Sequence, residues 1–213
     1  MSLDLDRMRR RSHVVMAISL LAGVCAAAGI YGYLKLHQPW TMALFVAMGW
    51  GSAAQTFVGQ NLGAGHEVRA RKSGHWAALY NGALMVAIAI AYHRWGESIV
   101  AFFDADPRVV AVAVSYVGIV SWSYVGLGTG VVLGSAITGA GATRTTLLTD
   151  LAVVLLVQVP ACAAAVLLPG ESLGRLWSAV TLTYGVSGAV YLVVYRVAPW
   201  MKAALEEARG AKA

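Results

Sequence analysis

One acidic side chain lies where it could bind a cation or a proton inside a membrane. The chain holds ten Asp and Glu residues, and Asp150 is the one that falls within a long apolar stretch. It stands about six residues inside that stretch, or about 9 Å along a helix. An acid at this position is a candidate proton site, cation site or counter-ion for a cationic substrate, and the alternative is a carboxylate hydrated near the lipid headgroups. Arg144 is too far around the helix for a local salt bridge.

Amide and aromatic side chains within other apolar stretches form a second group of candidates. Amides in lipid are costly unless they are partnered, so they either join helices or face a wet cavity. Aromatic residues could line a pocket, although they also pack in cores and in interfacial belts. The amides are Gln55, Gln60, Asn61, Asn81 and Gln158, and the aromatic residues are Tyr116, Trp122, Tyr124 and Tyr184.

The remaining reactive side chains do not form a catalytic or metal-binding set. Cys25 and Cys162 lie in apolar runs and are expected to be small buried hydrophobes, without a disulfide or a zinc site. No histidine has a ligand partner at helical spacing, and no nucleophile and base occur together at membrane depth. We therefore expect no metal, no cofactor and no enzyme activity. The histidines are His13, His37, His66, His75 and His93.

These candidates must be positioned by membrane-spanning helices. The chain has 213 residues, of which 59% are hydrophobic and 12% are charged, whereas soluble proteins are about one quarter charged. Its mean hydropathy is +0.67. The length leaves room for about six crossings of about 20 residues each. We predict an all-α polytopic membrane protein with spans at about 13–34, 40–62, 75–93, 109–133, 146–168 and 176–198.

The basic residues predict the direction of this six-helix bundle. A cytoplasmic N-terminus places twelve Lys and Arg residues inside and four outside, as the positive-inside rule requires. Residues 1–12 then form a basic cytoplasmic arm, 13–200 the transmembrane lobe and 201–213 a charged cytoplasmic tail. Both termini should face the cytoplasm of a bacterial-type inner membrane. The net charge of +6 is explained by this distribution, so we expect no nucleic-acid partner.

Glycines and one proline are expected to shape the helix contacts. The stretch GQNLGAGHEVRARKSG at 59–74 matches neither nucleotide-binding glycine motif. We interpret it as a helix end, with a close-packing face and a glycine stop before a basic cytoplasmic loop. A second glycine face serves either packing or helix sliding, and the proline could bend the fifth span. These residues are Gly59 and Gly63, then Gly126, Gly130 and Gly134, and finally Pro160.

Several consecutive segments resemble one transporter family. From about residue 40 to residue 202 the chain contains, in order, AAQTFVGQNLGAGHEVRARKSG, VAFFDADPRVVAVAVSYVGIVSWSYVGLG, SAITGAGATR, QVP and YRVAPWM. In order and spacing, these resemble the C-terminal half of multidrug and toxic compound extrusion (MATE) transporters. The resemblance implies one six-helix lobe of a twelve-helix exporter, which exchanges H⁺ or Na⁺ for organic, often cationic, small molecules.

The resemblance also implies that a second lobe is needed. An even number of spans gives a second copy the same orientation, so a homodimer or a separate N-terminal half could supply it. Ala142 replaces an acid that is frequent in the family's turn, and the first and fourth spans contain no acid. A coupling acid would therefore be Asp150 or belong to the partner lobe. The alternatives are a truncated, non-transporting fragment and a membrane assembly subunit.

Overall fold

The computed structural model describes residues 41–103, 106–167, 172–197 and 199–201. The predicted first span, the basic arm and most of the charged tail lie outside these residues. Within them the secondary structure is entirely helical. The elements are α2 (Thr41–Gly63), α3 (Glu67–Phe103), α4 (Pro107–Val120), the 3₁₀ turn η1 (Ser121–Ser123), α5 (Tyr124–Gly139), α6 (Thr143–Val153), the π turn η2 (Val154–Gln158), α7 (Val159–Leu167) and α8 (Ser172–Val197).

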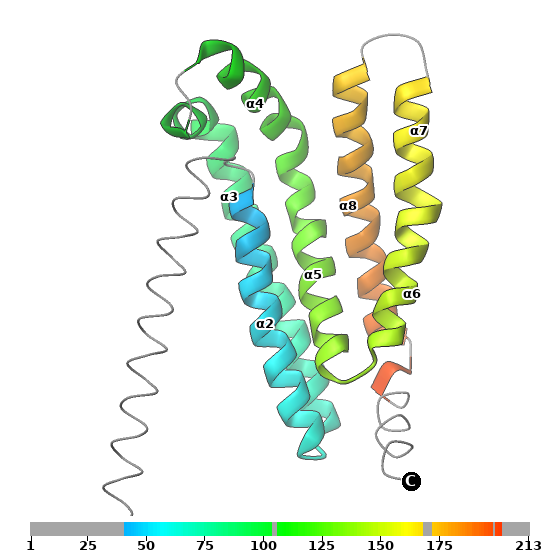
Figure 1. Ribbon diagram of the computed structural model, residues 1–213. Helices are drawn as coiled ribbons and strands as arrows, with labels where there is room; N and C mark the ends of the chain where they lie inside the picture. The colour runs from blue at the N-terminus through cyan, green and yellow to red at the C-terminus, as the bar shows by residue number, and fades with distance from the viewer. Residues whose placement is uncertain (1–40, 104–105, 168–171, 198, 202–213) are drawn as a thin grey trace, which may run out of the picture. The chain divides into compact units, whose positions relative to one another are not determined.

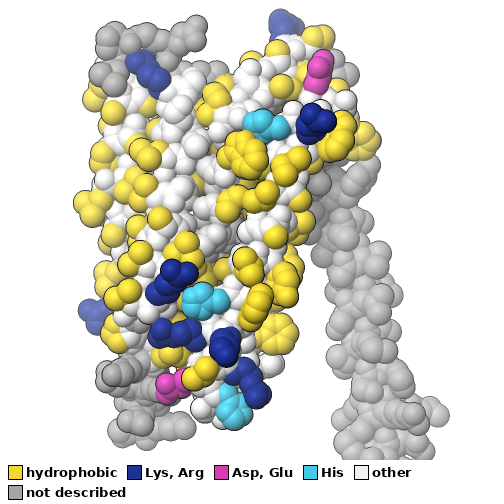
Figure 2. Space-filling view, turned by 180° about the vertical axis from the view of Figure 1, so that it is seen from behind, with side chains coloured by type: hydrophobic (Ala, Val, Ile, Leu, Met, Phe, Trp, Pro, Cys, Tyr) yellow, Lys and Arg dark blue, Asp and Glu magenta, His cyan; other side chains and the backbone are white. Residues whose placement is uncertain are grey.

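Most of these helices are suited to a membrane. Hydrophobic side chains cover the middle of the face shown in Figure 2, and Lys and Arg gather toward its two ends. In the described part of the chain, four helical stretches are long and apolar enough to cross a membrane. Those stretches are Glu67–Phe102, Pro107–Gly139, Thr143–Leu167 and Gly174–Val197. The all-helical prediction is confirmed here, whereas six crossings and their direction stay predictions.

The segment between the third and fourth predicted spans, residues 94–108, is largely helical. Helix α3 continues to Phe103 through a kink at Trp95, where φ is −132° and ψ is 20°. The run SIVAFF is apolar enough to extend the helix beyond the kink. The break comes at Asp106, whose side chain caps α4 by accepting a 2.9 Å hydrogen bond from the Arg108 N–H. Pro107 then occupies the first helical position, which suits its fixed φ.

Two turns of the same kind build the helical hairpins α2–α3 and α5–α6. At the first, Gly65 has a φ of +78°, and its N–H and that of His66 donate to Leu62 and Asn61. At the second, Gly141 has a φ of +95°, and equivalent bonds close the end of α5. This pattern ends a helix where glycine adopts the left-handed conformation. The predicted helix stop is therefore confirmed, with Gly65 as the residue that turns the chain.

Helix α5 lies between α2 and α8 and packs closely on both (Figure 1). A Cβ added at Gly139 would meet the backbone of Gln55 in α2, and one added at Gly126 would meet the backbone of Tyr184 in α8. Glycine is required at these two positions because backbone atoms of the neighbouring helix occupy the space. In lipid, such close approach supplies the dispersion contacts that hold helices together.

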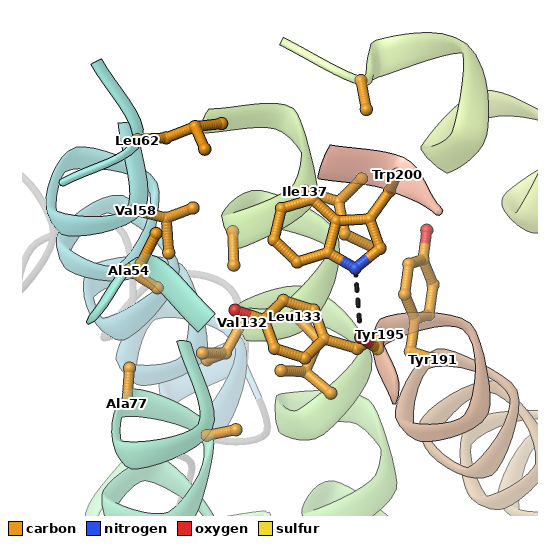
Figure 3. Packing of buried hydrophobic residues seen from close by; sticks show 14 residues of the cluster. Ala54, Val58, Leu62, Ala77, Val132, Leu133, Ile137, Tyr191, Tyr195 and Trp200 are labelled. Carbon is orange, nitrogen blue, oxygen red and sulfur yellow. Dashed lines mark hydrogen bonds between the residues drawn. The ribbon is translucent and has the colours of Figure 1, made fainter. Parts of the chain in front are cut away.

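A core of aliphatic and aromatic side chains joins α2, α3, α5 and α8 near the two hairpin turns (Figure 3). Trp200 is 1% exposed, stacks on Tyr195 with ring centroids 4.9 Å apart, and donates a 3.0 Å hydrogen bond to the Tyr195 carbonyl. The Tyr195 hydroxyl donates to the carbonyl of Arg71 at the start of α3. The segment after α8 is thereby fastened to the beginning of α3.

Candidate functional site

An open cavity of about 450 Å³ lies between α5, α8 and the α6–η2 segment, with one side chain from α2. Its wall is mostly apolar, but hydroxyls, two amides and one acid project into it. A cavity of this volume falls within the range of about 300–1,000 Å³ that small-molecule sites occupy. The lining residues are Gln55, Leu127, Gly130, Val131, Gly134, Ser135, Thr138, Thr146, Asp150, Val153, Val154, Gln158, Thr183, Tyr184, Ser187 and Tyr191.

Asp150 and Tyr191 form the polar centre of this cavity. The Tyr191 hydroxyl of α8 donates a 2.5 Å hydrogen bond to Asp150 Oδ1 of α6, and it lies 3.5 Å from the Thr146 carbonyl oxygen. Among the described residues no basic side chain forms an ion pair with Asp150, and none lines the cavity. In the described part of the chain, the hydrogen-bond donor to this carboxyl group is therefore a neutral hydroxyl rather than a basic side chain.

Gly134 makes room for this pair. A Cβ at Gly134 would stand 3.2–3.3 Å from three atoms of the Tyr191 ring, including the hydroxyl oxygen. One turn earlier, a Cβ at Gly130 would stand 3.1 Å from the Ser187 hydroxyl oxygen. The glycine face of α5 thus lets the polar face of α8 lie against it while the hydroxyls reach the cavity. The predicted face of Gly126, Gly130 and Gly134 packs on α8 along its whole length.

The backbone beside Asp150 is irregular. The π turn Val154–Gln158 follows α6 directly, and Pro160 stands two residues beyond it. Proline has no N–H and crowds the carbonyl one turn earlier, so the helix cannot keep its regular bonding there. The wider turn is closed by the Val159 N–H, which donates to the Val154 carbonyl. It carries the Gln158 side chain into the cavity wall. Single π turns in helices occur frequently at functional sites.

The structure brings together only part of the predicted path. Asp150 and Gln158 of the fifth predicted span share the cavity with Gln55 of the second. Asn61 does not line it, because its amide donates to the Phe57 carbonyl at 2.7 Å and to the Ser73 hydroxyl at 3.4 Å. Asn61 therefore joins α2 to α3.

Three other predicted residues lie outside the cavity. Asn81 is 0% exposed in α3, against Gly128 of α5, and neither polar atom of its side chain has a hydrogen-bond partner in the described part of the chain. Tyr116 packs edge to face on Trp177, with ring centroids 5.6 Å apart. Tyr124 is buried in the core that joins α3, α4 and α5. None of these three side chains lines the cavity that contains Asp150.

One correction and one omission concern single residues. Gly59 lies against the Gly139 carbonyl as expected, but a Cβ at Gly63 would meet nothing within 4 Å in the described part of the chain, so Gly63 takes no part in close packing there. Tyr191 was missed because an aromatic residue in an apolar span usually faces lipid or core. A signal was present: Tyr184, Ser187 and Tyr191 follow each other at spacings of three and four, which places three polar groups on one helix face.

The fold and the site define a class of protein. The described part is a polytopic helical membrane protein whose spans enclose an open cavity with an acid at its centre. Comparison with known proteins identifies the family. The family model described as MatE matches residues 14–164, which is more than half of the chain. The chain therefore belongs to the multidrug and toxic compound extrusion family that its motifs resemble.

A curated relative supports the same assignment. The probable multidrug resistance protein NorM of Pseudomonas aeruginosa is 30% identical to this chain over 166 residues. The match covers 74% of this chain and 33% of the relative, so the chain spans about a third of that relative's length. No solved structure matches the chain.

Proposed function

We propose that this chain is one lobe of a MATE-type exporter, which exchanges H⁺ or Na⁺ for organic cations across the inner membrane. The observation that carries the proposal is the Asp150 carboxylate, which lies in an open cavity between spans and has Tyr191 as its neutral partner. The family assignment and the name of the curated relative, a multidrug resistance protein, support drug efflux as the overall activity.

The chemistry of the cavity supports exchange. A single carboxylate can neutralise an inorganic cation, a proton or an organic cation, but it holds one of them at a time. When H⁺ or Na⁺ occupies the carboxylate, release of the organic cation is favoured. When H⁺ or Na⁺ leaves, the carboxylate can bind the next organic cation. The side-chain amides of Gln55 and Gln158 can form hydrogen bonds with neutral polar groups of a substrate. The apolar wall of the cavity suits the hydrophobic part of a lipophilic substrate.

A partner lobe is part of the proposal. The cavity of this lobe is open, so a second lobe facing it would exclude lipid and complete the substrate path. Inverted or parallel repeats of this kind place their sites near the repeat interface. A second copy of this chain and a separate N-terminal half are the two candidate partners.

The proposed direction has both termini in the cytoplasm. The two hairpin turns and the end of α8 lie at one end of the helices, because successive spans run in opposite directions. In the described residues this end carries Arg69, Arg71, Lys72, Arg144 and Arg196, whereas Arg94, Arg108 and Arg175 lie toward the other end. The excess supports a cytoplasmic location for the hairpin turns.

Efflux of a lipophilic fluorescent cation from cells tests the function. Wild type and Asp150→Asn would be expressed alone and together with a candidate N-terminal lobe, and their amounts in the membrane measured. We expect Asp150→Asn to abolish exchange, because the amide carries no charge and takes up no proton. Glu97→Gln is the matched control, since Glu97 is an exposed acid of α3 outside the cavity. Absence of efflux in every combination, with protein present, would overturn the proposal.

A further inference from the structure

A second polar cluster lies away from the cavity, where α3 meets the turn between α4 and α5. Trp122 Nε1 donates a 3.3 Å hydrogen bond to His93 Nε2, and the two rings are in contact with centroids 5.4 Å apart. On the other side of the imidazole, Nδ1 lies 3.2 Å from the Ala89 carbonyl oxygen and 3.2 Å from the Ser121 hydroxyl oxygen. Both ring nitrogens are therefore engaged.

These partners select one tautomer of the neutral His93 ring. An indole N–H is a donor only, so Nε2 must accept and cannot carry a proton. The proton of the neutral ring then sits on Nδ1, where the Ala89 carbonyl and the Ser121 hydroxyl are available acceptors. A second proton on Nε2 would set two N–H donors against each other across the contact with Trp122. The cluster is compatible with the neutral ring and incompatible with the imidazolium.

The cluster joins two breaks in the helical backbone. On α3 the non-helical residue Trp95 stands two residues after His93. On the other side, Ser121 and Trp122 belong to the 3₁₀ turn η1, which separates α4 from α5. Kinks and short 3₁₀ segments within spans are positions where helices can change direction. Helix α5 continues from this turn to Gly130 and Gly134 at the cavity.

We propose that His93, Ser121 and Trp122 form a proton-operated latch. With a neutral ring, the latch holds the α4–α5 turn against the kinked end of α3. Protonation of Nε2 expels the Trp122 donor and releases the turn, so that α5 gains freedom to tilt. The latch itself does not depend on the proposed function. If that function holds, the latch faces the side away from the cytoplasm and couples proton concentration there to the helix that borders the substrate cavity.

Few other charged groups surround the latch. The described residues of α2 and η1 contain no charged or titratable side chain. Glu97 forms no ion pair with His93 within the described residues. The arrangement leaves the Trp122 donor as the group that protonation must displace. The titratable and charged residues on the elements packed here are Tyr92, Arg94 and Glu97 of α3, Arg108 and Tyr116 of α4, Tyr124 of α5, and Arg175 and Tyr184 of α8, which also contacts η1.

Thermal unfolding of the purified full chain tests the latch over the range from about pH 8 to about pH 5, in which imidazoles titrate. Trp122→Phe removes the donor and keeps an aromatic ring. We expect wild type to melt about 2–4 °C above this variant at the alkaline end, a shift typical of one lost interaction in a chain of this size. Only the neutral ring can accept the hydrogen bond from Trp122. The difference in melting temperature between wild type and Trp122→Phe should therefore be present at high pH and disappear as acid protonates His93.

His93→Gln provides an independent variant, since its amide oxygen can accept from Trp122 but does not titrate. In the His93→Gln background, Trp122→Phe should lower the melting temperature by the same amount at both ends of the pH range. His75→Gln is the matched control, because His75 packs on Tyr195 at the other end of α3 and should leave the wild-type behaviour unchanged. A pH-independent difference between wild type and Trp122→Phe would overturn the latch, as would a pH-dependent one that survives in His93→Gln.

Discussion

Replacement of Gly188 by alanine should destabilise the helix bundle, because the new methyl group has no space between α5 and α8. The added Cβ would stand 2.6 Å from the Cα of Gly126, 2.7 Å from its carbonyl oxygen and 3.0 Å from its carbonyl carbon. All three are backbone atoms of α5, so no side-chain rotation relieves the contact. The two helices must move apart instead.

The expected loss in the free energy of unfolding of Gly188→Ala is the balance of two opposing effects. Carbon atoms pack best at about 3.5–4.0 Å, so α5 and α8 must separate by about 1 Å. Overpacking of this kind typically costs about 1–3 kcal/mol. Alanine favours the helix over glycine by up to about 1 kcal/mol, which offsets part of that cost. A net loss of about 1–2 kcal/mol in the free energy of unfolding corresponds to about a 5–30-fold change in the ratio of folded to unfolded protein.

Reversible denaturation of the purified chain in lipid–detergent bicelles measures this change. Gly118→Ala in α4 is the matched control, since the same substitution there would bring the Cβ within 4 Å of nothing. That variant should be unchanged or more stable, because only the helix preference acts. Equal free energies of unfolding for Gly188→Ala and Gly118→Ala would refute the reasoning from backbone contact.

Two further substitutions separate structural from exposed groups. Tyr191→Phe keeps the ring and removes the hydroxyl that donates to Asp150. A double-mutant cycle with Asp150→Ala should therefore give a coupling energy of about 1 kcal/mol in the free energy of unfolding. If the losses of the two single variants simply add up in the double variant, the hydrogen bond is contradicted. Trp200→Ala should cost about 3–5 kcal/mol, because Trp200 is 1% exposed and stacks on Tyr195. Trp76→Ala, at a position that is 55% exposed, is its control and should cost far less; equal losses would show that Trp200 is not a core residue.

The acid of the candidate site could be found from the sequence, but its partner could not. Asp150 was recognisable because a carboxylate in an apolar stretch is rare and costly. Tyr191 is 41 residues away, and although its spacing from Tyr184 and Ser187 places three polar groups on one helix face, that spacing does not say which helix the face meets. Asn81 shows the same limit. Its amide was a candidate either for a polar path or for joining helices, and the structure buries it against Gly128 of α5, with no hydrogen-bond partner among the described residues.

Repeated small residues were equally ambiguous. Gly59 and Gly63 have the same four-residue spacing as the glycines of α5, yet only Gly59 lies against another backbone. Spacing places residues on one face of a helix, but it does not say how far along that face the neighbouring helix extends. Gly63 is the last residue of α2, and in the described part of the chain an added Cβ there has no neighbour within 4 Å.

The sequence by itself determined that the protein is helical and membrane-embedded and which family it belongs to. These properties depend on local quantities: apolar length, the placement of Lys and Arg, glycine turns and short ordered motifs. The tertiary structure alone decided that Asp150 meets Tyr191, that Asn61 joins two helices and that His93 holds a turn 28 residues away. Those contacts arise from the rotation and depth at which separate helices pack, and neither is encoded within a single span.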